Sequence, residues 1–128
     1  MFLETINTTP RYCAVYGQPI KHSASPAMHN PAIAELGLDW KYLAVEVPTK
    51  DLCKAIEKAK RMRYIGLNLT VPHKLLAMEL VDTIDDSAKK WGAINTICFE
   101  VKDENNIWSP LGQTPDTKKS ELRTKGYN

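Results

Sequence analysis

Apolar runs of strand length alternate with amphipathic segments between residues 12 and 101. The runs predict strands at 12–16, 40–47, 64–70 and 94–101. The amphipathic segments predict helices at 27–36, 51–62, 72–80 and 87–91. Strands separated by helices indicate an α/β fold of three layers, with a mainly parallel sheet and helices on both faces.

The pattern stops after Val101. Residues 102–128 contain the turn signals Asn105-Asn106, Ser109-Pro110 and Thr114-Pro115, with few apolar residues between them. We therefore expect a domain at 1–101, followed by a polar loop or linker at 102–128.

Composition excludes several classes of protein. The net charge of +2 arises from 17 basic and 15 acidic residues scattered along the chain, without the basic face expected of a nucleic-acid-binding protein. No segment approaches the ~20 apolar residues of a membrane span, and the first residues do not resemble a secretory leader. Cys13, Cys53 and Cys98 form no CxxC pair, which argues against disulfides or structural zinc and favours a cytoplasmic location. The three histidines also lack metal-ligand spacing, so we expect no metal.

One polar cluster, "GQPIKHSASPAMHN", occupies residues 17–30. Ser25 precedes Pro26 and is explained locally as a helix N-cap. Ser23 is not explained by that cap. Two hydroxyls beside a helix N-terminus could instead bind a carboxylate, because the free N–H groups there favour an anion.

A second cluster, "GLNLTVPHK", ends the predicted strand at 64–70. Asn68 and Thr70 share one side of the strand, where they could bind a ligand or anchor a loop. Lys74 falls in the first turn of the following helix, where the dipole disfavours a cation. It is either a solvated surface lysine or a proton-transfer group whose neutral form is easily reached.

A third cluster, "GAINTI", covers residues 92–97. Gly92 suits the residue that closes a helix. Asn95 and Thr96 could satisfy local backbone groups, but an amide that both donates and accepts also suits recognition of a hydroxyl.

Together, "YGQPIKHSASPAMHN", "GLNLTVPHK" and "GAINT" resemble the substrate-binding domain of shikimate dehydrogenases, over about residues 12–101. The family reduces 3-dehydroshikimate to shikimate with NADPH in aromatic amino acid biosynthesis. The resemblance implies that Lys74 is the catalytic acid/base and that Asp86, more weakly, lies near the nicotinamide cofactor. Ser23 and Ser25 would hold the shikimate carboxylate. The ring hydroxyls would be surrounded by Asn68, Thr70 and Asn95.

The chain also departs from this family. Its six glycines form no G-x-G-x-x-G pattern, so it lacks the loop that binds NADP. Gly126-Tyr127-Asn128 reads as the first half of the family's G-x-N-T-D-G motif, whose aspartate is a second catalytic residue. This favours a truncated chain over the rival placement of that motif at 112–116. Pro31 stands in a predicted helix and should kink it.

Two functions follow from the resemblance. The first is the substrate-binding part of a shikimate dehydrogenase, inactive by itself and completed by an NADP-binding domain in cis or trans. The second is a stand-alone module that binds shikimate, quinate or a similar hydroxylated cyclic carboxylate without chemistry.

Overall fold

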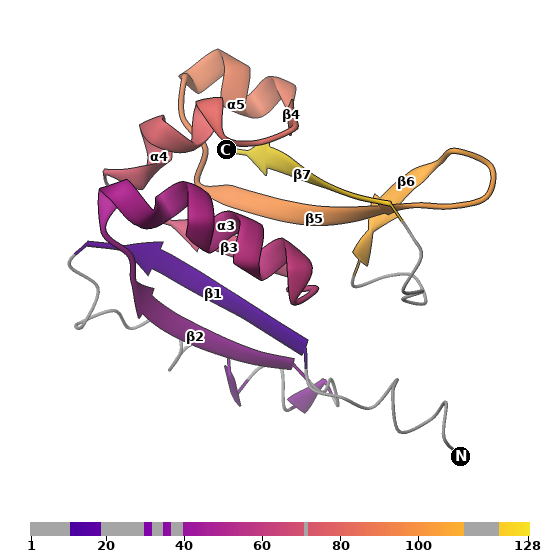
Figure 1. The fold of residues 1–128 in the computed structure, drawn as a ribbon, viewed down its shortest axis with the longest axis horizontal. Helices are drawn as coiled ribbons and strands as arrows, with labels where there is room; N and C mark the ends of the chain where they lie inside the picture. Colours follow the sequence, from indigo (N-terminus) through magenta and orange to yellow (C-terminus); the bar gives the residue numbers. More distant parts are fainter. Residues whose placement is uncertain (1–10, 19–29, 32–34, 37–39, 71, 112–120) are drawn as a thin grey trace.

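The computed structural model describes residues 11–18, 30–31, 35–36, 40–70, 72–111 and 121–128 (Figure 1). The strands are β1 (Arg11–Gly17), β2 (Trp40–Glu46), β3 (Gly66–Leu69), β4 (Thr83–Ile84), β5 (Thr96–Lys102), β6 (Trp108–Pro110) and β7 (Leu122–Tyr127). The helices are α3 (Leu52–Arg61), α4 (His73–Leu76) and α5 (Asp86–Trp91), with 3-10 helices η1 (Thr49–Asp51) and η2 (Ala77–Glu79). The four predicted strands are therefore found, whereas most of the predicted helix at 27–36 lies outside the described residues.

The strands form one sheet in the order β2-β1-β3-β5-β7-β4, with β6 paired to β5. β1 is parallel to β2 and β3, whereas β5 is antiparallel to β3, β6 and β7. The connection from β3 to β5 runs through α4, η2, β4 and α5 and brings the chain back to the end where β3 finishes, so β5 runs antiparallel to β3. The predicted α/β class is confirmed, and the parallel pairs of this mixed sheet are β1-β2, β1-β3 and β4-β7.

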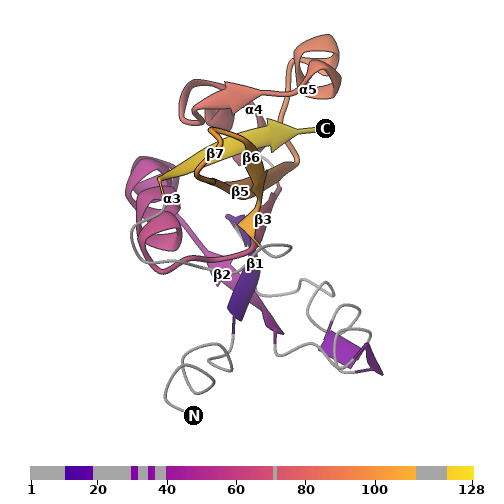
Figure 2. The ribbon, with the colours of Figure 1, turned by 90° about the vertical axis from the view of Figure 1, so that its right-hand side faces the viewer.

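Helix α3 covers one face of the sheet (Figure 2). It buries Leu52, Ile56 and Ala59, which lie on the apolar stripe that the sequence predicts. Alternate strand positions face this helix, and the buried apolar residues of β3 and β5 are Leu67, Leu69, Ile97, Phe99 and Val101. None of the described helices is long and apolar enough to cross a membrane.

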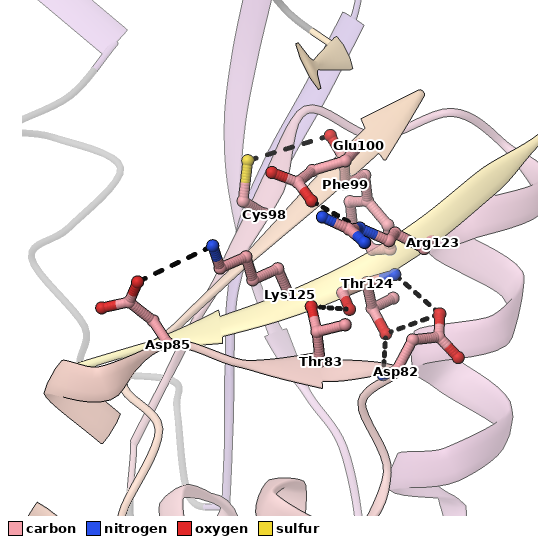
Figure 3. Close-up of polar contacts among 9 residues, drawn as sticks. All are labelled: Asp82, Thr83, Asp85, Cys98, Phe99, Glu100, Arg123, Thr124 and Lys125. Atoms are coloured by element: carbon pink, nitrogen blue, oxygen red, sulfur yellow. Dashed lines mark hydrogen bonds and ion pairs between the residues drawn. The ribbon is translucent and has the colours of Figure 1, made fainter. Parts of the chain in front are cut away.

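The other face of β5 and β7 is polar (Figure 3). Strand pairing places Glu100 opposite Arg123, whose Nε donates to Glu100 Oε1 at 2.7 Å. The Arg123 guanidinium also lies 4.3 Å from the centroid of the Trp108 ring. Glu100 is only 5% exposed, so Arg123 gives this buried side chain a charged hydrogen-bond partner.

The prediction of a loop at 102–128 is wrong for β6 and β7, which extend the sheet beyond Val101. β7 escaped detection because its buried residues are Thr124 and Gly126, so Leu122 is the one large apolar residue on its inward face. Polar contacts hold it instead (Figure 3). Asp82 Oδ2 accepts from the Thr124 amide at 2.8 Å, and the Asp82 amide donates to Thr124 Oγ1 at 2.9 Å.

Gly126→Ala is expected to lower the free energy of unfolding by about 1–3 kcal/mol, the usual cost of overpacking a core. The added Cβ would overlap Cδ1 of Ile94 and lie 2.8 Å from its Cγ1. Ile94→Val removes Cδ1, so adding this change should recover part of the loss. Urea unfolding followed by circular dichroism measures the variants, and an unaffected Gly126→Ala chain would contradict the packing of β7 against Ile94.

Candidate functional site

One end of the strands, here called the site edge, brings together several strand termini and several of the residues that the sequence singles out. β3 ends at this edge, β5 begins there, and β7 ends beside β5, with α4 and α5 close by (Figure 1). The backbone N–H of Leu69 donates to the backbone carbonyl of Asn95 at 2.9 Å, and the backbone N–H of Asn95 donates to the Tyr127 carbonyl at 2.9 Å. Asn95 is therefore held between the ends of β3 and β7.

A chain of side-chain hydrogen bonds crosses this edge. The Tyr42 hydroxyl donates to Asn68 Oδ1, and Asn68 Nδ2 donates to Thr96 Oγ1 at 3.1 Å. Thr96 Oγ1 in turn donates to Asn95 Oδ1 at 3.1 Å. Two residues that the sequence analysis proposed as ligand contacts, Asn68 and Asn95, are thus linked through Thr96.

Tyr42 was missed as a site residue because it lies within a predicted strand and was interpreted only as part of it. It is 5% exposed and packs with Val15 on the face of the sheet opposite α3. Asn30 fixes its backbone: Asn30 Nδ2 donates to the Tyr42 carbonyl at 2.9 Å, and the Tyr42 amide donates to Asn30 Oδ1 at 2.8 Å. No signal in the sequence pairs these two positions.

Thr70 lies just beyond β3, at the same edge. Its amide donates to the Tyr16 carbonyl at 3.0 Å, and its hydroxyl lies 3.5 Å from the same oxygen. The Tyr16 ring belongs to the core, where burial, followed by the nearby Tyr64, raises the pKa of Tyr16 to about 12. Tyr16 is therefore a neutral core residue whose backbone positions Thr70.

Lys74 is the second residue of α4 and is half-buried. Its carbonyl accepts from the Ile94 amide at 2.9 Å, which fixes the helix turn beside Asn95. The neighbouring His73 is fully buried, and its Nε2 lies 2.7 Å from the Val47 carbonyl and donates to it. The Lys74 ammonium makes no hydrogen bond or ion pair within the described ranges.

The helix that carries Lys74 is shorter than the sequence predicts. The predicted helix at 72–80 is divided into the single turn of α4 and the 3-10 helix η2. A single turn aligns few peptide dipoles, so the dipole at Lys74 is weaker than the sequence argument assumed. Anchoring of the backbone, rather than a long helix, positions this lysine.

Asp86 is exposed at the start of α5, and no described contact joins it to Lys74 or Asn95. Its neighbour Asp85 caps the helix instead, accepting from the Ser87 amide at 3.1 Å. This hydrogen bond, assisted by Lys125 at 3.7 Å, holds the pKa of Asp85 below its usual value.

The remaining predicted positions are distributed as follows. Ser23 and Ser25 lie outside the described residues, as does the whole of the rival motif placement at 112–116. Asn128 reaches the site edge, where its amide donates to Ser87 Oγ at 3.0 Å and its Nδ2 donates to the Ala93 carbonyl at 2.8 Å. Within the described ranges, no group of His, Cys, Asp or Glu side chains could hold a metal ion.

The chemistry of the side chains at this edge is that of polar recognition. An ammonium donor and an amide are held by adjoining segments, since Lys74 bonds through its backbone to Ile94, the residue before Asn95. Such a pair suits a hydroxylated compound better than an apolar one.

Comparison with known proteins identifies the family. The model of the shikimate dehydrogenase substrate binding domain matches residues 15–97. The shikimate dehydrogenase (NADP(+)) of Methanopyrus kandleri is 43% identical over 95 residues, which cover 74% of this chain and 33% of that protein.

Solved structures agree. A shikimate dehydrogenase in complex with NADP+ has a TM-score of 0.72 and 32% identity, covering 93% of this chain and 34% of that one. The Thermus thermophilus shikimate 5-dehydrogenase in complex with shikimate has a TM-score of 0.71 and 30% identity, covering 92% and 38%. The chain spans about a third of the length of the curated relatives it matches. It belongs to the family of shikimate dehydrogenase substrate-binding domains.

Proposed function

We propose that this domain binds shikimate or 3-dehydroshikimate and supplies the catalytic lysine for their NADP-dependent interconversion in aromatic amino acid biosynthesis. One observation carries the proposal. The Lys74 carbonyl accepts a hydrogen bond from the Ile94 amide, and this bond holds Lys74 beside the segment that contains Asn95. The Thermus thermophilus relative, which was solved with shikimate, supports the choice of ligand.

Each side chain takes a role that its chemistry allows. When a hydride leaves an alcohol carbon, the hydroxyl proton must also depart, and neutral Lys74 would accept it. Asn95 and Thr70 would bind ring hydroxyls, with Asn68 beside them. Ser23 and Ser25 would bind the carboxylate.

The residues of this chain do not fit NADP by themselves. The sequence has no G-x-G-x-x-G loop for the phosphates, and Asp86 is exposed, with no contact to Lys74 or Asn95 among the described residues. We therefore assign the cofactor to an NADP-binding domain in cis or trans, with Asp86 as a weak candidate for a contact to it. The free cysteines Cys13, Cys53 and Cys98 support a cytoplasmic location.

A second candidate function is a stand-alone module that binds shikimate, quinate or a similar hydroxylated cyclic carboxylate. Such a module would use the same binding residues and would need no cofactor. Catalysis after an NADP-binding domain is supplied would decide for the dehydrogenase, and binding without any catalysis would decide for the module.

Titration calorimetry tests the shared part of both functions. The chain should bind shikimate weakly, and Asn95→Ala should weaken binding about 3- to 10-fold, the effect of one hydrogen bond. Lys58→Ala, an exposed change on α3, is the matched control and should leave the affinity unchanged. If a sample with a cooperative melting transition gives no heat at millimolar shikimate, the proposed function is wrong.

A further inference from the structure

The hydrogen-bond chain from Tyr42 to Asn95 has a direction. A phenol O–H is acidic, with a pKa of ~10, and readily acts as a donor. The Tyr42 hydroxyl donates to Asn68 Oδ1, which turns the other end of that amide, Nδ2, toward Thr96. An unconstrained amide could present either end.

Thr96 continues the chain of hydrogen bonds in the same direction. Its hydroxyl has a single proton, and its oxygen already accepts from Asn68 Nδ2 at 3.1 Å. The proton is therefore free to point to Asn95 Oδ1, also 3.1 Å away. Because the Asn95 oxygen faces Thr96, its NH₂ group faces away from Thr96, and it has no hydrogen-bond acceptor within the described ranges.

We propose that Tyr42 is a positioning residue that sets the amide orientation of Asn95, so that the site presents an N–H donor to the ligand. This inference rests on the proposed function, in which Asn95 contacts a ring hydroxyl. Both ends of the Asn68 amide are engaged by protein, so Asn68 transmits the orientation and is not the principal ligand contact. The site then selects a ligand oxygen that accepts a hydrogen bond.

The chain of hydrogen bonds begins at the Tyr42 hydroxyl, and the surroundings of Tyr42 hold this residue in place. Its ring is 5% exposed, and the Asn30 amide holds both its backbone N–H and its carbonyl on β2. Without the hydroxyl, the Asn68 amide can turn over, the Thr96 proton can point to Asn68, and Asn95 can turn its NH₂ toward Thr96. The donor and acceptor ends at the site would then be exchanged.

Tyr42→Phe tests the proposal, with Thr96→Val as a second, nearly isosteric break in the chain. Tyr64→Phe is the matched control, since it removes the same hydroxyl from a tyrosine that stacks on Tyr12, away from the chain of bonds. In ligand-free protein, Tyr42→Phe and Thr96→Val should both shift the side-chain amide NMR signals of Asn95, whereas Tyr64→Phe should not. Shikimate binding should weaken about 3- to 10-fold in both test variants.

A double-variant cycle separates positioning from general stability. In an Asn95→Ala background, Tyr42→Phe should cause almost no further loss of affinity, because it acts through Asn95. An equal loss in both backgrounds, or unchanged Asn95 signals in folded Tyr42→Phe protein, would overturn the proposal. If the parent chain fails to bind shikimate, the proposed function fails, and the ligand-free NMR signals still decide whether Tyr42 orients Asn95.

Discussion

A chain shortened to residues 1–120 is expected to lose its cooperative unfolding transition, because it lacks β7. This strand pairs with six residues of β5 and two of β4. Without β7, Phe99 of β5 would lose the strand residue that pairs with it, Thr124. The Asp82 carboxylate would also lose the two hydrogen bonds that Thr124 donates to it. The combined effect is comparable to the ~5–15 kcal/mol that stabilises a whole domain.

Thermal melting followed by far-ultraviolet circular dichroism measures this effect. Glu121→Gln in the full chain is the control, because it removes only the exposed ion pair between Glu121 and Lys102 at 3.7 Å. That change should alter the free energy of unfolding by less than ~1 kcal/mol. A 1–120 chain that melts like the full chain would show that β7 is dispensable for the fold.

The apolar pattern predicted the strands that supply several large side chains to the core and missed short or polar strands such as β7. β3 and β5 alternate Leu, Ile, Phe and Val with polar residues, which gives a clear signal. β7 turns Thr124 and Gly126 inward, and Gly126 must be small because Ile94 fills the space next to it. The requirement comes from a residue over thirty positions away, which local periodicity cannot reveal.

Prediction of the functional site from the sequence is limited in the same way. Lys74 and Asn95 stand in distinctive motifs, so the sequence singled them out. Tyr42 acquires its proposed role only because β1 lies between β2 and β3 and because the hydroxyl reaches across to Asn68. The length of α4 was also beyond prediction, since its apolar residues Leu75 and Leu76 continue a helical pattern while both remain exposed.

Lys74→Ala is expected to reduce turnover by ~10²–10⁴-fold, the usual contribution of a general acid/base, in an enzyme that contains this domain. A suitable enzyme is a chimera in which this chain replaces the matching third of the Methanopyrus kandleri shikimate dehydrogenase. The relative would supply the NADP-binding part, while this chain would supply Lys74 and the proposed shikimate contacts. NADPH absorbance during shikimate oxidation measures kcat and KM.

The division of the effect between kcat and KM tests the role of the lysine. If Lys74 accepts the hydroxyl proton as the hydride leaves, its main contribution is made in the transition state, so kcat should fall far more than KM rises. Lys58→Ala, exposed on α3, should leave both constants unchanged and controls for the loss of one positive charge. A chimera with full turnover after Lys74→Ala would refute the acid/base role. A large rise in KM at constant kcat would show instead that Lys74 only binds the substrate.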